Sequence, residues 1–314
     1  MTAPASDASI CNAMTVDVED YYHANVFDDT VDRSTWPGLE SRVVPNTERV
    51  LALMHDAGVR GTFFILGCVA EQFPSLVRTI AAEGHEIASH GFAHRRITTQ
   101  TPDAFREDIR RAKDTLESAA GVSVLGYRAP SYSVTRKTLW ALDIIVEEGY
   151  LYDSSVFPIH HDTYGIPDAP RHPHAVSCHG RTLFEVPGST VRLGGMNLPI
   201  GGGAYFRLAP YAWTRWGIGR VNASESKPAT FYIHPWEIDP DQPRLPASRF
   251  GAWKHYFNLG KTEARFARLL RDFRFAPLFE VLSESQPIRQ PGRADVIAFP
   301  LDRPRVAEHG AWRR

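Results

Sequence analysis

Short apolar runs alternate with amphipathic segments through the first half of this chain, and this alternation restricts the fold more than any other feature. We expect strands at 13–18, 61–67, 85–90, 124–130 and 150–158, separated by helices at 46–58, 74–84, 101–121 and 135–149. Repeated strand–helix–strand units are typical of parallel sheets with right-handed crossovers. The sequence therefore predicts an α/β fold, either a doubly wound sheet or a (β/α) barrel. A Rossmann fold is disfavoured, because no GxGxxG motif opens a helix after the first strand.

The second half of the chain follows a different pattern. Residues 157–182 are rich in proline and histidine, and we expect them to form a long loop. We expect strands broken by glycine turns over 182–210, a strand ending in His234 over 229–239, and a helix over 262–273. Residues 1–283 are expected to form a single domain with a C-terminal extension from about 240, and residues 284–314 a loosely held tail.

Composition and charge argue against several classes of protein. The formal net charge is -1, which gives no electrostatic reason to bind nucleic acid. The three cysteines form no CxxC pair, and their odd number argues against a disulfide framework. The N-terminus lacks the pattern of a signal peptide, and no run approaches the ~18 apolar residues that read as a transmembrane segment. We therefore expect a cytoplasmic protein; peripheral membrane association and the oligomeric state stay open.

Polar side chains collect where the expected strands end, and in a barrel those ends carry the chemistry. These residues are Asp17, Glu19, His90, His94, Arg128 and Asp153. If the turn after 85–90 is helical, His90 and His94 lie on one face and can bind one metal ion. Imidazole suits Zn²⁺, Co²⁺, Ni²⁺ or Fe²⁺. The alternative is a pair of ordinary solvent-side histidines.

The run TVDVED at 15–20 places three carboxylates at the end of the first strand. A mononuclear hydrolytic site needs a third ligand, usually anionic, and an open position for water. One carboxylate could bind the ion while another accepts the proton of the water; the alternative is a solvated loop. Arg128, in GYRAP, could orient such a carboxylate, unless it forms a surface salt bridge. His234, in YIHPWE, could act as a general acid, unless it is a core histidine bonded to backbone.

The order of the motifs is more specific than any one of them. TVDVED, SHGFAH, GYRAPSYS, YDSSVFP and FYIHPWE follow one another on successive expected strands. In this order they resemble the polysaccharide deacetylases of the NodB-homology type, also called carbohydrate esterase family four. The resemblance spans roughly residues 13–240. It is closest to the branch found with exosortase-linked exopolysaccharide clusters, through the segments DVED, RAPSYS, GGGAYFR and HPWE.

The resemblance implies a distorted (β/α) barrel of the polysaccharide deacetylase type and a role for each matching residue. It makes Asp17 the catalytic base, Arg128 the residue that tethers the base, and His234 the general acid. It makes His90 and His94 ligands of one divalent ion, with Zn²⁺ expected first and Co²⁺, Ni²⁺ or Fe²⁺ as alternatives.

The first motif departs from the family pattern. Many relatives have two adjacent aspartates there, whereas Val18 follows Asp17 in this chain. Relatives with a D-x-D spacing favour Glu19 as the third metal ligand, and a one-residue insertion favours Asp20. The sequence leaves both open, with Glu19 preferred.

We therefore expect a metal-dependent deacetylase that hydrolyses N-acetyl groups of sugars in an exopolysaccharide or its precursor. One alternative is an allantoinase-like hydrolase of cyclic amides or ureides on the same fold. Another is a carbohydrate-binding protein that has lost catalysis, although the presence of all the expected site residues weighs against it.

Overall fold

The structure is a computed structural model of the 314-residue chain, and it describes residues 10–285. Nearly all of the tail expected over 284–314 therefore lies outside the described residues. Within residues 10–285, no helix combines the length and the apolar content that crossing a membrane requires.

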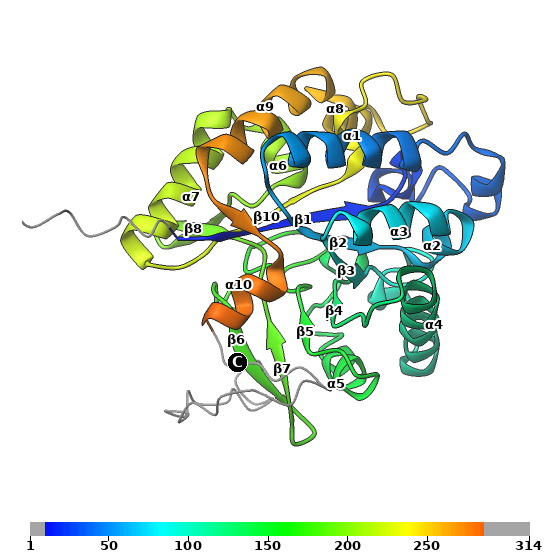
Figure 1. The fold of residues 1–314 in the computed structure, drawn as a ribbon, viewed down its shortest axis with the longest axis horizontal. Coiled ribbons are helices and arrows are strands. Elements are labelled where there is room, and N and C mark those ends of the chain that lie inside the picture. Colours follow the sequence, from blue (N-terminus) through cyan, green and yellow to red (C-terminus); the bar gives the residue numbers. More distant parts are fainter. Residues whose placement is uncertain (1–9, 286–314) are drawn as a thin grey trace, which may run out of the picture.

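One large sheet organises the described chain (Figure 1). Its spatial order is β10 (Thr230–Ile233), β1 (Asn12–Val18), β2 (Thr62–Ile65), β3 (Glu86–Ser89), β4 (Gly126–Tyr127), β5 (Tyr152–Asp153), β7 (Arg181–Glu185) and β6 (His174–Cys178). The short strand β11 (Phe275–Ala276) also pairs with β1. These pairs are parallel, except for the antiparallel hairpin β6–β7. The α/β fold predicted from the alternation is confirmed.

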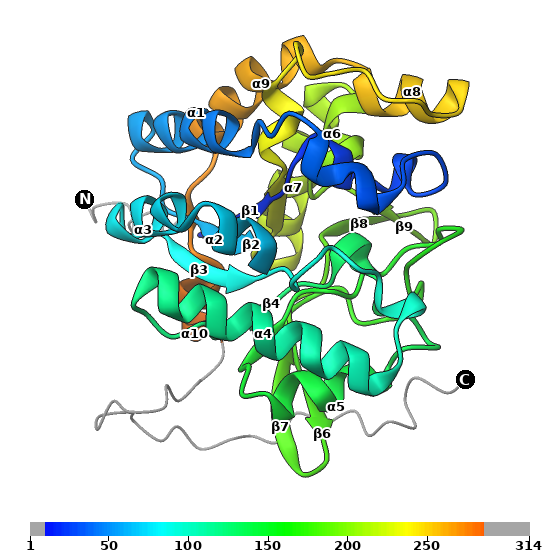
Figure 2. The ribbon, with the colours of Figure 1, turned by 90° about the vertical axis from the view of Figure 1, so that its right-hand side faces the viewer.

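Helices surround the sheet (Figures 1 and 2). The first half contributes α1 (Val43–Asp56), α2 (Gly67–Gln72), α3 (Pro74–Ala82), α4 (Pro102–Ala120) and α5 (Trp140–Glu147). The second half contributes α6 (Gly203–Leu208), α7 (Tyr211–Glu225), α8 (Arg249–Tyr256), α9 (Leu259–Asp272) and α10 (Leu278–Ser285). A separate antiparallel pair is formed by β8 (Thr190–Leu193) and β9 (Met196–Pro199). The short 3-10 helices are η1 (Tyr21–His23), η2 (Asn25–Phe27), η3 (Arg33–Gly38), η4 (Ile97–Thr99), η5 (Pro130–Tyr132) and η6 (Pro235–Ile238).

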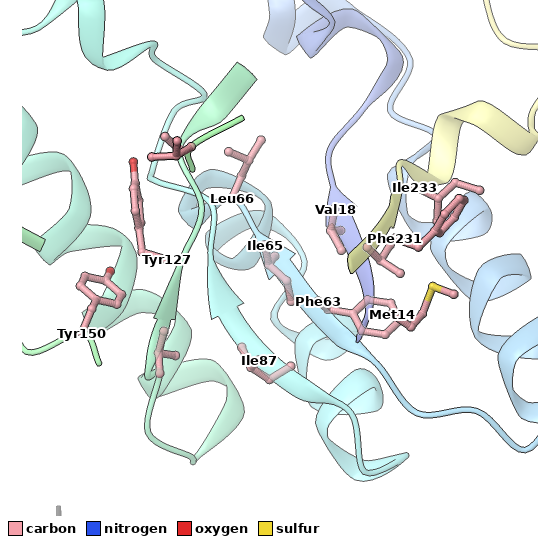
Figure 3. Close-up of a cluster of buried hydrophobic side chains, with 14 of the residues drawn as sticks. Met14, Val18, Phe63, Ile65, Leu66, Ile87, Tyr127, Tyr150, Phe231 and Ile233 are labelled. Atoms are coloured by element: carbon pink, nitrogen blue, oxygen red, sulfur yellow. The ribbon is translucent and has the colours of Figure 1, made fainter. Parts of the chain in front are cut away.

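Successive side chains of β1 point to opposite faces of the sheet, so that one set packs in the main core and the other lies on the opposite face. Met14 and Val18 belong to the main core, where they pack with residues such as Phe63 of the neighbouring strand (Figure 3). Ala13 belongs to a separate cluster on the opposite face. Asp17 shares this second face, and it lies near the carboxyl end of the strand. The strand pattern thus points a carboxylate inward at the end where a barrel carries its site.

Regular strand pairing does not close the sheet between its two ends in the described residues, but single backbone hydrogen bonds cross the gap. Beyond β7, the N–H of Val186 donates to the carbonyl of Asp153 (2.8 Å), which continues the pairing of β5 with β7. On the other side, the N–H of Tyr232 donates to the carbonyl of Gly201 (2.7 Å). The N–H of Ile200 donates to the carbonyl of Ser189 (3.1 Å), which joins the segment after β7 to the segment that contacts β10. The strand order and these bonds describe a curved parallel sheet with an irregular seam.

The seam depends on glycine. Gly202 has a φ of 125°, and a Cβ at this position would lie 1.8 Å from the carbonyl oxygen of Tyr232. No other residue allows the backbone to approach β10 so closely.

Two expectations for the second half were wrong in part. The segment 157–182, expected to be a loop, contains β6 and the start of β7. The strand β6 was missed because only Val176 and Cys178 of it are buried, which gives a weak period-2 signal. Residues 203–208, expected within a region of strands and glycine turns, form α6 instead. The glycines there permit the close approach to β10 rather than marking a turn alone.

Candidate active site

A cavity of about 370 Å³ opens where β1, β3 and β10 end. Both halves of the chain contribute to its wall. The lining includes Asp17, Glu19, His90 and His94 from the first half, and Tyr164, His234, Trp236 and Lys254 from the second. The cavity therefore collects most of the polar residues that the sequence singled out.

Three of them form a compact group that could hold a metal ion. One ligand atom each from Glu19, His90 and His94 lies within 4.8 Å of the other two, and all three side chains are buried. Oε2 of Glu19 is 2.7 Å from Nε2 of His94 and 3.9 Å from Nε2 of His90. Burial alone raises the pKa of Glu19, but His94 and His234 outweigh it and hold that pKa well below its ordinary value.

His90 is oriented for coordination by its second ring nitrogen. Nδ1 lies 2.8 Å from the carbonyl oxygen of Arg128, which can only accept, so Nδ1 carries the proton. Nε2 then presents a lone pair towards Glu19. A backbone carbonyl that fixes the tautomer in this way is the usual companion of a metal-binding histidine.

His90 and His94 lie close together without the helical turn that we expected after β3. The segment that follows β3 is not helical, and His94 has a φ of 50°, in the left-handed region. Arg33 holds this strained loop by donating to the carbonyl oxygens of Ala93 (2.8 Å) and His94 (2.9 Å). Histidines four positions apart therefore converge here because of the loop conformation.

Asp17 and Arg128 form a buried ion pair at 2.6 Å, between Oδ1 and Nη1. The remaining guanidinium donors bind Oγ1 of Thr15 (2.8 Å) and the carbonyl and hydroxyl of Ser154 (3.2 and 3.0 Å). The arginine is thus fixed on several sides, and it fixes the carboxylate. Oδ2 of Asp17 lies 3.9 Å from Nε2 of His234.

His234 follows β10 and belongs to a chain of charged groups. Its Nδ1 lies 2.6 Å from Oε1 of Glu237, and Oε2 of Glu237 accepts from Nε of Arg207 (2.6 Å). Glu237 and Arg207 are buried, whereas 18% of the His234 side chain is exposed. Burial lowers the pKa of His234, but Glu19 and Glu237 raise it to about 9.

Neither Glu237 nor Arg207 was predicted from the sequence as a site residue. Glu237 lies three positions after His234 in HPWE, a spacing that allows the side-chain contact within η6. Arg207 ends the segment GGGAYFR, and nothing local in the sequence indicates that it reaches Glu237.

Asp20, the alternative third ligand, lies outside the group. Its Oδ2 accepts from the hydroxyl of Ser41 (2.6 Å) and its Oδ1 from the backbone N–H of Arg42 (2.9 Å). The carboxylate therefore binds the segment that leads into α1.

Asp153 also lies away from the cavity. It is fully buried beside Glu185, in register on the neighbouring strand β7. Burial raises the pKa of Asp153 to about 6, and burial and Asp153 together raise the pKa of Glu185 well above its ordinary value. The two carboxyl groups lie side by side in the interior of the protein instead of facing a ligand.

Two family models match this chain. Residues 19–145 match a model described as polysaccharide deacetylase. This match supports an assignment of the chain to the polysaccharide deacetylase family. Residues 154–283 match a domain of unknown function, DUF3473. Glu19, His90 and His94 lie in the first matched segment, and His234, Glu237 and Arg207 lie in the second.

Curated relatives match the chain over a short stretch. A peptidoglycan-N-acetylglucosamine deacetylase of Bacillus cereus is 33% identical over 98 residues, which are 31% of this chain and 36% of the relative. A chitooligosaccharide deacetylase of Rhizobium leguminosarum bv. trifolii is 34% identical over 73 residues, 23% of this chain and 34% of the relative. The chain thus spans about a third of the length of these relatives.

Solved structures share the fold. A Mycobacterium smegmatis protein assigned to the polysaccharide deacetylases is 22% identical, with a TM-score of 0.55 over 94% of this chain and 98% of its own. A PuuE allantoinase is 15% identical, with a TM-score of 0.57 over 90% of this chain and 93% of its own. Because both enzyme classes use this fold, the fold alone does not choose between them.

Proposed function

We propose that this protein is a metal-dependent deacetylase that hydrolyses N-acetyl groups of sugars in an exopolysaccharide or its precursor. The observation that carries the proposal is the meeting, in one cavity, of the group Glu19, His90 and His94, the ion pair Asp17–Arg128, and His234. The family match over residues 19–145 supports hydrolysis of an amide bond. The names of the matched relatives support an N-acetylated sugar as the substrate.

The proposed metal ligands are Glu19, His90 and His94, with Zn²⁺ as the first candidate and Co²⁺, Ni²⁺ or Fe²⁺ as alternatives. Two imidazoles and one carboxylate are a donor set that leaves further coordination positions open, as hydrolytic sites require. A carboxylate buried between two imidazoles also needs a compensating charge, which a divalent ion provides. When bound, such an ion polarises the acetyl carbonyl and lowers the pKa of a water molecule towards ~7.

Asp17 is the proposed general base. Arg128 binds Oδ1, so the carboxylate cannot rotate freely, and Oδ2 is left to accept the proton of the attacking water. Arg128 itself is held by Thr15 and Ser154, which makes it a positioning residue for the base. This arrangement favours one fixed geometry for proton transfer.

His234 is the proposed general acid. An amine leaves poorly until it is protonated, and Nε2 of His234 lies on the same side of the cavity as Oδ2 of Asp17 (3.9 Å) and Oε1 of Glu19 (3.6 Å). Its Nδ1–H donates to Glu237, so Nε2 is the nitrogen that faces the leaving group. Glu237 stabilises the imidazolium, and Arg207 orients Glu237.

Acetate release tests the proposal. The metal-replete protein should release acetate from N-acetylglucosamine tetramers, lose this activity after chelation, and regain it with Zn²⁺. Allantoin is assayed in parallel for ureide products. Hydrolysis of allantoin without any acetate from the sugars would replace the proposed function by the allantoinase-like alternative.

A further inference from the structure

The helix α8 brings an unpaired positive charge to the mouth of the cavity. Lys254 lines the cavity and is half-buried. Among the described residues, no carboxylate lies within ion-pair distance of its ammonium group, although Asp17 and Glu19 line the same cavity. Asp17 forms its ion pair with Arg128, and Glu19 contacts the histidines. A half-buried ammonium without an anion is unfavourable, so a ligand that supplies a negative charge would be favoured there.

Two aromatic rings lie next to this charge on the same helix. Phe250 lines the cavity and is 72% exposed, and Trp253 is 50% exposed. Their ring centroids are 5.8 Å apart at an angle of 28°, so they form one stacked apolar surface. Exposed aromatic surface at a cavity mouth marks a place where a ligand packs.

The position of α8 is fixed by buried contacts. Nη1 of Arg207 donates to the carbonyl oxygens of Lys254 (3.0 Å), His255 (2.6 Å) and Phe257 (3.2 Å) at the end of the helix. His255 stacks on Trp236, with ring centroids 4.5 Å apart. Figure 2 shows α8 at the outer edge of the fold, away from the strands. The helix therefore presents Lys254 and the aromatic pair from a rigid support.

We propose that α8 forms a sugar-binding subsite for an anionic group, a carboxylate or a phosphate, carried by the substrate close to the acetamido group that is hydrolysed. Lys254 pairs with the anion, and Phe250 packs against the sugar ring that carries it. The inference rests on the proposed deacetylase function and adds a substrate class to it: acidic N-acetylated glycans or phosphate-linked N-acetylated sugars.

Two pairs of substrates test this subsite, and in each pair one member carries an anionic group that the other lacks. A hyaluronan tetrasaccharide is compared with the same tetrasaccharide after reduction of its carboxylates. N-acetylglucosamine 1-phosphate is compared with methyl N-acetyl-α-glucosaminide. The first pair detects a carboxylate and the second a phosphate. We expect kcat/KM for acetate release to be roughly tenfold higher for the anionic member of at least one pair, and this preference to shrink as salt is added.

The variant Lys254→Met should remove the preference, measured as the ratio of kcat/KM between the two members of a pair, and Lys254→Arg should keep it. Lys261→Met, which changes an exposed lysine of α9, is the matched control and should behave as wild type. Phe250→Ala should raise KM for the anionic and the neutral substrates alike. An equal rate for both members of both pairs in wild type, or a preference that survives Lys254→Met, would overturn the subsite.

Binding separates failure of the subsite from failure of the proposed function. The same four sugars are titrated against the metal-replete Asp17→Asn variant, with and without Lys254→Met, and followed by tryptophan fluorescence. If charge-dependent binding is lost with Lys254 but no sugar releases acetate from wild type, the subsite stands and the deacetylase function fails. If acetate is released without charge-dependent binding or rate, the subsite fails alone. Absence of both binding and acetate release overturns both.

Discussion

The buried pair Arg207–Glu237 allows the sharpest test of how the second half of the chain supports the site. Glu237 accepts from Arg207 (2.6 Å) and from Nδ1 of His234 (2.6 Å). The change Glu237→Gln keeps the shape but removes the negative charge, so Arg207 is left buried with backbone carbonyls as its partners. Removing one member of a buried ion pair costs about 3–5 kcal/mol.

Urea unfolding of a double-mutant cycle measures this cost. We expect Glu237→Gln and Arg207→Met each to lower the free energy of unfolding by several kcal/mol, and the double variant to lose much less than the sum, because it leaves no unpaired charge. Arg265→Met is the matched control, since Arg265 also donates to three backbone carbonyls but forms no ion pair among the described residues. Its cost should be smaller, about 1–3 kcal/mol, because hydrogen bonds of a half-buried side chain are lost but no buried charge is left without its partner.

Activity gives a second readout of the same pair. Without the charge of Glu237, the imidazolium of His234 is less stabilised, so amide hydrolysis should slow by roughly 10²-fold. Activated acetate esters need little protonation of the leaving group and should slow less. Additive costs in the unfolding cycle, together with an unchanged amide-to-ester ratio, would refute the reasoning and leave Glu237 with no role beyond packing.

Further predictions concern the proposed metal ligands, the proposed base and the buried carboxyl pair. Metal analysis should find the ion lost in Glu19→Ala and kept in Asp20→Ala; the reverse result would exchange their roles. Asp17→Asn should keep the metal and lose about 10²–10⁴-fold in kcat, whereas near wild-type acetate release would exclude it as the base. Because the pKa values of Asp153 and Glu185 are raised, their contribution to stability is present below about pH 4 and is lost as pH rises, through about 6 for Asp153 and through the raised pKa of Glu185. In Glu185→Gln, the free energy of unfolding should therefore fall less than in wild type between about pH 5 and about pH 8, and an equal fall in urea titrations would contradict the raised pKa values.

The sequence predicted the first half of the fold well, because its strands and helices carry strong periodic signals. The apolar residues of β1 recur at every second position, and Asp17 was singled out because it lies near the end of this strand. The edge strand β6 was missed, since proline and histidine surround a run in which only two side chains are buried. Short segments that depend on distant neighbours for their conformation are the ones that local patterns describe least well.

The same distinction holds for the site. The spacing of His90 and His94 singled out both residues, but it suggested a helical turn, whereas their convergence depends on a loop held by Arg33. Arg207 was not predicted, because its importance comes from contacts with Glu237 and with the end of α8. Residues that act by joining separate parts of the chain leave no local pattern to find.

The place of β1 between β2 and β10 has a consequence for the order in which the protein can form during synthesis. The hydroxyl of Thr15 donates to the carbonyl of Phe231, 216 positions further along the chain. Until that segment leaves the ribosome, one edge of the strand that carries Asp17 has no partner from β10. Contacts so distant in sequence form late and slowly. The strand that carries the proposed base therefore keeps an unpaired edge until the strand that precedes the proposed acid has been synthesised. A chaperone that binds extended apolar strands would bind at this edge.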